Sequence, residues 1–249
     1  MSFTSWRGTV GVIKPTLRPG SLEEFIRLLP EGIGVVPLFL NARKGTKDEF
    51  ESVRELTESK IAELVEAGVD LVHPEGAPPN FMVYGYKGEC DIVERLEQQH
   101  GVPILTGGRT HIDGMRAMGM ERIVGVTYFR GNNGEVNDVV TSYFSDAGFD
   151  VLAMEGMEVP FEEVGHISEG QFYAHAKKAF LKHPDADGIY IFGSGWRVLG
   201  AVETLEQDLG VPVLHPVPAR VWAVQERLHV RQPRSGYGRL LEDMPELPA

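Results

Sequence analysis

The sequence contains one α/β unit twice, and this repeat limits the folds that are open to the chain. The first copy, residues 70–77, reads Asp-Leu-Val-His-Pro-Glu-Gly-Ala and leads through a helix-like stretch to Gly-Val-Pro-Ile-Leu at 101–105. The second copy, residues 187–195, reads Asp-Gly-Ile-Tyr-Ile-Phe-Gly-Ser-Gly and leads to Gly-Val-Pro-Val-Leu at 210–214. Each copy has the pattern of a strand, a glycine turn, a helix and a second strand. The repeat predicts two similar units whose strand-to-helix turns face each other across a cleft.

Short apolar runs alternate with amphipathic, helix-like segments along the whole chain. Strands are expected at 9–13, 33–40, 69–72, 102–105, 122–128, 151–154, 188–192 and 212–214. Helices are expected from residue 22, at 47–67, 90–98, 110–118, 136–147, 168–183, 198–209 and 219–228. In the helix at 47–67 apolar residues recur with helical spacing, among them Val53, Leu56 and Ile61. The alternation predicts an α/β fold with parallel sheets and helices on both faces. The tail 231–249, rich in proline, glycine and charge, is expected to pack over the surface.

The composition narrows the class of protein. The chain has 249 residues, of which 42% are apolar, and this is enough for one large domain or two small lobes. The net charge of −12 and the absence of a basic run argue against nucleic-acid and membrane-surface partners. A single cysteine, Cys90, excludes an intramolecular disulfide and a cysteine-rich metal site. No signal-like or membrane-spanning run is present, so we expect a soluble cytoplasmic protein.

Several segments resemble one known superfamily in order and spacing. They are Pro-Asp-Ala-Asp-Gly-Ile at 184–189, the paired Gly-Val-Pro segments, and Gly-Tyr-Gly-Arg-Leu at 236–240. The chain from residue 9 to about 242 resembles the aspartate/glutamate racemase superfamily, above all its arylmalonate decarboxylase group and next its maleate isomerase group. The resemblance implies two pseudo-symmetric lobes with the active site between them, here 1–115 and 116–215, with about 216–249 packing back onto the first. It also implies chemistry beside a carboxylate with no metal or organic cofactor.

The resemblance also shows what this sequence lacks. Members of the superfamily usually carry a cysteine at each glycine turn, as base and acid in the racemases or as nucleophile in maleate isomerase. The decarboxylase group keeps only the second, as a proton donor. Here the two positions fall on Gly76 and Gly193. Cys90 matches neither and is expected to be a packing residue. Racemisation by two cysteines and addition of cysteine to an alkene are therefore excluded.

The glycine turns still predict an anion site. Turns ahead of helices present free backbone N–H groups and the positive end of the helix dipole. On the second side Gly193, Ser194 and Gly195 are expected to bind substrate, and Ser194 adds a hydroxyl. On the first side Gly76 and Ala77 are expected to do so, although the two prolines that follow have no N–H to offer.

Polar residues at other strand ends are the candidates for acid–base work. Lys14, His73 and Glu75 can carry a proton if desolvation shifts their pKa values. Tyr128 can donate a proton or a hydrogen bond to an enolate. Arg18 and His215 are candidate substrate ligands, the former because it aligns roughly with a substrate-binding asparagine of maleate isomerase. The competing interpretation is structural, with Lys14 and Glu75 forming an ion pair between strands. Tyr84 can donate to an enolate, and Arg109 and Arg197 can bind an anionic substrate. The alternative for these three residues is an ordinary packing or surface role.

These features favour an enzyme that acts on a small anionic carboxylate through an enolate-like intermediate. A decarboxylase, hence a lyase, with acid–base residues other than cysteine is the first hypothesis. Two other enzyme classes are alternatives. One is an isomerase, and the other is a hydrolase or hydratase in which Glu75 or His73 activates water. A non-catalytic protein that binds small carboxylates is the alternative from another class. The sequence leaves homo-oligomerisation open.

Overall fold

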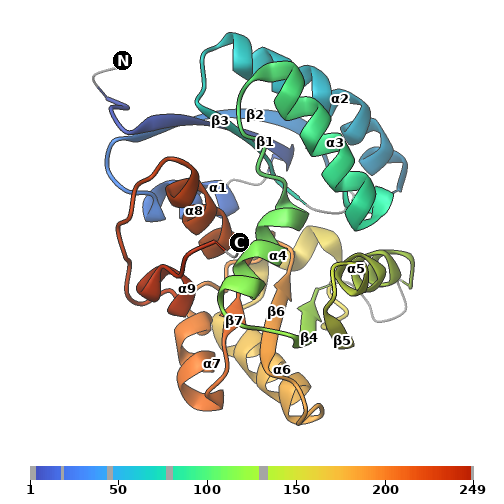
Figure 1. Cartoon of the computed structure of the whole chain (residues 1–249). Coiled ribbons are helices and arrows are strands. Elements are labelled where there is room, and N and C mark those ends of the chain that lie inside the picture. Colours follow the sequence, from blue (N-terminus) through green and yellow to red (C-terminus); the bar gives the residue numbers. More distant parts are fainter. Residues whose placement is uncertain (1–3, 18–19, 44–46, 77–80, 129–133, 248–249) are drawn as a thin grey trace.

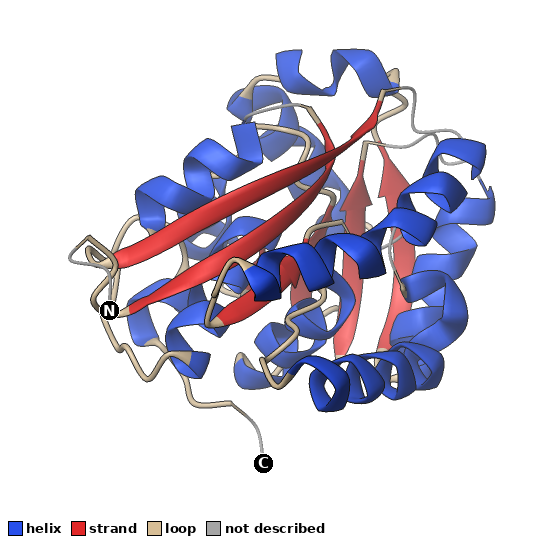
Figure 2. Ribbon diagram, turned by 90° about the horizontal axis from the view of Figure 1, so that it is seen from above, coloured by secondary structure: helices blue, strands red, loops and turns tan. Residues whose placement is uncertain are grey.

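Two parallel sheets, each flanked by helices, form the molecule, as the sequence predicts (Figure 1; Figure 2). The computed structural model describes residues 4–17, 20–43, 47–76, 81–128 and 134–247. The first sheet has the order β2-β1-β3 and the second the order β5-β4-β6-β7. All described strand pairs are parallel. The strands are β1 Gly8–Thr16, β2 Ile33–Ala42, β3 Leu71–Pro74, β4 Arg122–Thr127, β5 Asp150–Gly156, β6 Gly188–Phe192 and β7 Val213–Leu214.

Helices connect these strands in the alternation that a parallel sheet requires. They are α1 Gly20–Leu28, α2 Lys47–Glu66, α3 Gly85–His100, α4 Gly107–Ala117, α5 Gly134–Asp146, α6 Glu169–Leu181, α7 Ala201–Leu209, α8 Pro216–Arg227 and α9 Arg239–Asp243. Two 3₁₀ turns, η1 Met82–Tyr84 and η2 Phe161–His166, were not expected from the sequence. Among the described residues no helix combines the length and the apolar character needed to cross a bilayer.

The duplicated Gly-Val-Pro segment has one structural role in both sheets. Gly101 and Gly210 end α3 and α7 in the left-handed conformation, at φ 70° and 72°, which glycine adopts without strain. The carbonyl of Pro103 then accepts from Val72 N at 2.9 Å, and that of Pro212 accepts from Ile189 N at 3.0 Å. The repeat therefore encodes how each helix turns back into its sheet.

The segment expected as a strand at 102–105 makes only one isolated bridge, between Ile104 and Val72. The physical reason is Pro74. After the bond from Leu105 N to Val72 O, the next ladder bond would run from residue 74 N to Leu105 O, and proline has no N–H. In the second sheet the equivalent residue is Ile191, which has an N–H, and β7 pairs over two residues. On the outer side of each segment a glutamate accepts the N–H that faces away from the sheet, Glu97 from Ile104 at 2.8 Å and Glu206 from Val213 at 2.9 Å. Ile104 pairs with Val72 of β3 as Val213 of β7 pairs with Ile189 of β6.

Side-chain alternation along β1 decides which way the candidate residues face. Val12 belongs to the large core that runs into the second sheet, whereas Ile13 packs in a smaller core under α2 and α3. Since side chains alternate between the two faces of a strand, Lys14 lies on the Val12 face. His73 and Glu75 follow Leu71 at steps of two and lie on that same face. The helices α2 and α3 cover the opposite face of this sheet (Figure 1), so the candidate residues of the first sheet lie on the face away from them.

Several element boundaries differ from the sequence expectation. The strand expected at 69–72 occurs at 71–74, which places Glu75 directly after its last residue. Two helices begin three residues early because a side chain caps them: Thr106 accepts from Arg109 N, and His215 accepts from Val217 N. The helix α3 begins five residues early, at Gly85, and α7 begins three residues late, at Ala201.

The C-terminal tail is more than a surface covering, contrary to expectation. Leu240, Leu241 and Met244 of the α9 region are buried in the large core. The indole N–H of Trp222 in α8 donates to Pro245 O at 2.8 Å and anchors the end of the tail. The apolar residues of the tail are few and stand between charged ones, so its overall composition does not indicate that they are buried. The helix α8 itself packs against α1 and α4.

The apolar side of α2 also differs in one position. Leu56 is 46% exposed, whereas Thr57 is fully buried. Thr57 tolerates burial because its Oγ1 donates to Val53 O at 2.8 Å. The buried stripe therefore follows Val53, Thr57 and Ile61, and Leu56 lies beside it.

Candidate active site

A buried ion pair joins the ends of two neighbouring strands of the first sheet. Ile13 of β1 is paired with Pro74 of β3, so the next residues, Lys14 and Glu75, lie side by side. Lys14 Nζ is 3.2 Å from Glu75 Oε1 and 3.3 Å from Oε2. The two residues are 1% and 4% exposed. The ion pair between strands that the sequence offers as a structural role for Lys14 and Glu75 is therefore formed.

Two serine hydroxyls converge on the same carboxylate from different parts of the chain. Ser21, in the first turn of α1, donates to Glu75 Oε1 at 2.6 Å and accepts from Lys14 Nζ at 2.7 Å. Ser194, in the glycine turn after β6, donates to the same Oε1 at 2.9 Å. The second sheet therefore reaches the first at Glu75, and the two duplicated turns meet at one carboxylate.

Arg220 of α8 supplies a second cation to this carboxylate. Its Nη1 lies 2.8 Å from Glu75 Oε2, and its Nη2 donates to Ser21 O at 3.2 Å. The guanidinium also lies 5.1 Å from the centre of the Phe25 ring, within the range of a cation–π contact. Arg220 is 2% exposed. We call Lys14, Ser21, Glu75, Ser194 and Arg220 the carboxylate cluster.

The charges of the carboxylate cluster determine the protonation state of Glu75. Burial alone would raise its pKa. The positive charges of Arg220 and Lys14, with hydrogen bonds from Ser21 and Ser194, outweigh burial and hold the pKa of Glu75 well below its usual range. Glu75 is therefore an ionised, fully hydrogen-bonded anion at neutral pH. Two cations and one anion leave the cluster with one net positive charge.

Three buried histidines lie near the carboxylate cluster and are neutral. Burial, followed by the charge of Arg220, lowers the pKa of His73 and of His215 to about 3. Burial also lowers the pKa of His111 to about 3, with His73 and Arg220 as further causes. Nδ1 of His73 contacts Leu105 O, and that of His215 accepts from Val217 N at 3.1 Å. Nδ1 of each ring therefore has a structural partner, whereas Nε2 of each ring is buried with no hydrogen-bond partner among the described residues. The low pKa values make both rings weak bases.

The second glycine turn is built against an aromatic pair. Gly193 has φ 93°, and Gly76 in the first turn has φ 88°, so the two turns share a conformation that side chains disfavour. A Cβ on Gly193 would lie 2.7 Å from the Tyr128 hydroxyl and closer still to its ring. The Trp196 indole meets the Tyr128 ring edge to face at 5.1 Å and donates to Gly193 O at 2.8 Å. Tyr128 thus fills the space that a side chain at Gly193 would need.

Among the described residues no other sequence candidate belongs to the carboxylate cluster. Arg18 and Ala77 fall outside the described residues. Arg197 pairs with Glu23 at 2.7 Å on the surface, with both side chains more than half exposed, so its surface alternative holds. Arg109 lies in the first turn of α4. Gly195 follows Ser194 in the turn and is partly exposed.

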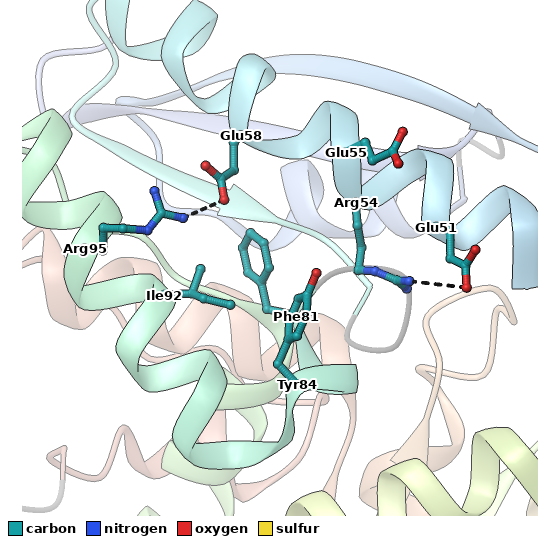
Figure 3. A pocket seen from close by; sticks show the side chains of 8 residues that line it. All are labelled: Glu51, Arg54, Glu55, Glu58, Phe81, Tyr84, Ile92 and Arg95. Atoms are coloured by element: carbon teal, nitrogen blue, oxygen red, sulfur yellow. Dashed lines mark hydrogen bonds and ion pairs between the residues drawn. The ribbon is translucent and has the colours of Figure 1, made fainter.

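A separate pocket of about 500 Å³ opens between α2 and the η1–α3 segment (Figure 3). Its rim carries two ion pairs, Arg95 with Glu58 at 2.6 Å and Arg54 with Glu51 at 3.9 Å. The Tyr84 ring, 56% exposed, and Phe81 line it from below α2 (Figure 3). Of the candidate residues named from the sequence, only Tyr84 lines this pocket. None of the residues that line it belongs to the carboxylate cluster.

Sequence reasoning missed two members of the carboxylate cluster. Ser21 directly precedes the helix expected from residue 22, and Arg220 lies inside α8, so neither stands at a strand end, where the sequence places its candidates. An arginine among the apolar residues of an otherwise buried helix is the signal that could have found Arg220, since buried arginines need an anionic partner. Across the described segments no group of three or more histidine, cysteine, aspartate or glutamate residues has metal-binding geometry.

Comparison with known proteins places the fold in a group of enzymes. The family model described as arylmalonate decarboxylase matches residues 22–241. The chain is 25% identical over 244 residues to arylmalonate decarboxylase of Bordetella bronchiseptica, with 94% of this chain and 97% of that protein covered.

Solved structures of two enzymes share the architecture. A double mutant of arylmalonate decarboxylase in its liganded form superimposes with a TM-score of 0.86 at 21% identity, covering 95% of this chain and 99% of that one. The maleate isomerase of Pseudomonas putida S16 superimposes with a TM-score of 0.85 at 22% identity, with the same coverage of 95% and 99%. At this identity these two similarities concern the fold.

Proposed function

The chain belongs to the arylmalonate decarboxylase family, and on that premise we propose that it is a cofactor-independent enzyme that decarboxylates a small carboxylate through an enolate-like intermediate. The observation that carries the proposal is the Ser194–Glu75 hydrogen bond, which brings the glycine turn of the second sheet onto the charged end of the first. The site of reaction is the region between the two turns.

The net positive charge of the carboxylate cluster supports an anionic substrate. Lys14 and Arg220 are buried, where a charge acts through a lower dielectric than in water and is worth more. Loss of CO2 leaves the electron pair of the broken C–C bond on the remaining fragment as an enediolate. The carbon of the enediolate then takes up one proton, so the reaction consumes no other reagent. Two fixed cations next to the turns favour that anion over the uncharged alternatives.

Glu75 is a positioning residue in this account and does not carry the proton. Its low pKa makes it a weak base, and Lys14, Ser21 and Ser194 donate hydrogen bonds to it. It holds Lys14 and Arg220 in place and offsets part of their charge. His73 is equally unsuited to activate water, because its ring is buried and its pKa is about 3. The geometry therefore supports a hydrolase or hydratase based on these two residues less well than a decarboxylase.

Anion binding is assigned to the second turn. Ser194 and Gly195 follow Gly193 at the carboxyl end of β6, where ligands of parallel sheets bind. Their backbone N–H groups are suited to hold a carboxylate or an enediolate oxygen. The relative solved with maleate, a maleate isomerase variant of Pseudomonas putida S16 with a TM-score of 0.81 at 22% identity, supports a small dicarboxylate as the substrate class.

A non-catalytic carboxylate-binding protein is the second candidate, and one observation favours it. Glu75 itself accepts hydrogen bonds from the hydroxyls of Ser21 and Ser194. A carboxylate of the protein therefore already uses hydrogen-bond donors between the two turns that a substrate carboxylate would need. A binding protein needs no proton donor and tolerates this arrangement. It predicts binding of a carboxylate with no turnover.

The test is to supply the purified protein with phenylmalonate, malonate and maleate in separate reactions and to follow CO2 and products by NMR. The proposal predicts CO2 release from phenylmalonate or malonate. Conversion of maleate to fumarate without CO2 release would identify an isomerase instead. Calorimetric binding of these compounds without any turnover would establish the binding protein and contradict the decarboxylase.

A further inference from the structure

We propose that the Tyr128 hydroxyl is the proton donor to the enediolate carbon, an assignment that rests on the proposed function of the same site. The starting observation is its position at the second glycine turn. The hydroxyl lies 2.7 Å from the point where Gly193 would carry its Cβ. The anion-binding residues Ser194 and Gly195 follow Gly193 directly, so an anion held by that turn lies next to the phenol.

The position of the phenol is fixed by the surrounding structure. Tyr128 is 7% exposed and meets the fully buried Trp196 edge to face. Trp196 is held in turn by the Phe172 ring at 4.9 Å and by its hydrogen bond to Gly193 O. The backbone carbonyl of Tyr128 accepts from Val159 N at 3.2 Å. Ring and turn therefore form one packed unit, which is the condition for delivering a proton to one face of a substrate.

The glycine at position 193 follows from this arrangement. A residue with φ 93° and no space for a Cβ has to be glycine, and the atoms that fill the space belong to Tyr128. The titratable group of this turn is thus the phenol, which stands beside the backbone of Gly193. Among the other candidates Glu75 is ionised and His73 is neutral with a structural partner, so neither can donate a proton readily.

The step balances with no further reagent. The C–C bond to the leaving carboxylate breaks, CO2 departs, and the electron pair remains on the substrate as an enediolate. The O–H bond of Tyr128 breaks as the new C–H bond forms, which leaves a phenolate. Water then returns a proton to the phenolate. Because the phenol approaches from one side, a prochiral substrate should give one enantiomer.

The experiment uses 2-methyl-2-phenylmalonate, a prochiral arylmalonate, with the wild-type protein, Tyr128→Phe, Gly193→Ala and Tyr190→Phe. For the wild type we expect CO2 release and a single enantiomer of 2-phenylpropionate. In Tyr128→Phe we expect kcat to fall at least about 10²-fold, with KM within about threefold and an enantiomer ratio near one to one in the remaining product. Gly193→Ala displaces the phenol and should also lose the enantiomer preference.

The Tyr190→Phe variant controls for loss of a neighbouring buried phenol, which stands on β6 three residues before Gly193 and interacts electrostatically with Tyr128. Tyr190 is fully buried and its hydroxyl is paired with His111 Nδ1 at 3.0 Å. Its substitution lowers stability but should leave a single enantiomer. A Tyr128→Phe protein that keeps both its kcat and its single enantiomer would overturn the donor assignment while the decarboxylase stands. No CO2 release by the wild type would overturn the proposed function, and the donor assignment with it.

Discussion

Ser194 donates a hydrogen bond of 2.9 Å to Glu75, and these two residues belong to the two copies of one repeated unit. Each residue lies next to a glycine with positive φ, Gly193 before the serine and Gly76 after the glutamate. The repeat thus converges on an asymmetric contact, a hydroxyl from one side and a carboxylate from the other. Lys14 and Arg220 complete that contact with positive charge.

Substitution of Glu75 by glutamine should destabilise the protein strongly. Glu75→Gln removes the negative charge and leaves Lys14 and Arg220 buried without a counter-ion, which costs roughly 3–5 kcal/mol of the free energy of unfolding. Urea unfolding at pH 7.5 measures this. Glu63→Gln is the matched control, because Glu63 pairs with Lys60 on the surface and its loss should change stability by no more than about 0.5 kcal/mol. Equal effects of the two substitutions would contradict a buried ion cluster.

Removal of the Ser194 hydroxyl should lower both stability and activity. Ser194→Ala deletes one hydrogen bond to a charged group, worth about 1.5–3 kcal/mol. If the contact holds the anion-binding turn in register with the cations, kcat/KM should fall tenfold or more, since about 1.4 kcal/mol corresponds to tenfold. Ser59→Ala removes an exposed hydroxyl of α2 and should leave both quantities unchanged. Unaltered turnover in Ser194→Ala would separate the turn from catalysis.

Acid should destabilise the fold from about pH 6.5 downwards. His73, His111 and His215 have pKa values near 3 in the folded protein and 6.5 as the ordinary value. Between about pH 6.5 and pH 3 the unfolded chain therefore binds more protons at these histidines than the native state does. Their contribution to stability is fully present above pH 6.5 and is lost as the pH falls. At pH 5.5 the loss is about 1.4 kcal/mol for each histidine. His215→Asn keeps an N-cap and should reduce the difference between urea unfolding at pH 7.5 and at 5.5 by that amount. An unchanged difference would show that His215 is protonated in the native state.

Glu89 should show the opposite pH dependence from Glu75. Burial raises the pKa of Glu89, and the hydroxyls of Thr106 and Tyr143 offset this only in part. A raised pKa in the folded protein means that stability is complete below about pH 4.5 and is lost as the pH rises through the folded value. Glu89→Gln is neutral and nearly isosteric, so it removes this loss, and between pH 5 and pH 8 its stability should gain relative to that of the wild type. A variant whose stability drops relative to the wild type as the pH rises would contradict a buried carboxyl of raised pKa.

The sequence predicts the fold well because the fold depends on patterns that repeat. Two Gly-Val-Pro segments, each with a left-handed glycine after a helix, fix where the chain re-enters each sheet. The strand expected at 102–105 is reduced to one bridge because Pro74 of β3 has no N–H for the next ladder bond, and this depends on a pairing register that local sequence does not reveal.

The candidate site is predictable only in part. Lys14, Glu75 and Ser194 stand at strand ends, where sequence reasoning looks for them. Arg220 lies far along the chain in a helix, and only the packing of α8 on α1 brings it to Glu75. The protonation states also depend on burial, since the charge on Glu75 follows from its neighbours and cannot be inferred from the residue type.

The most direct test of a decarboxylase that works without a thiol is the rate of CO2 release from phenylmalonate by the wild-type protein and by Cys90→Ser, measured side by side. Cys90 lies in α3, half-buried, and contributes nothing to the carboxylate cluster as described. The expected result is CO2 release with the same kcat in both proteins, unaffected by iodoacetamide. No CO2 from the wild type, or activity that disappears in Cys90→Ser, would contradict the account.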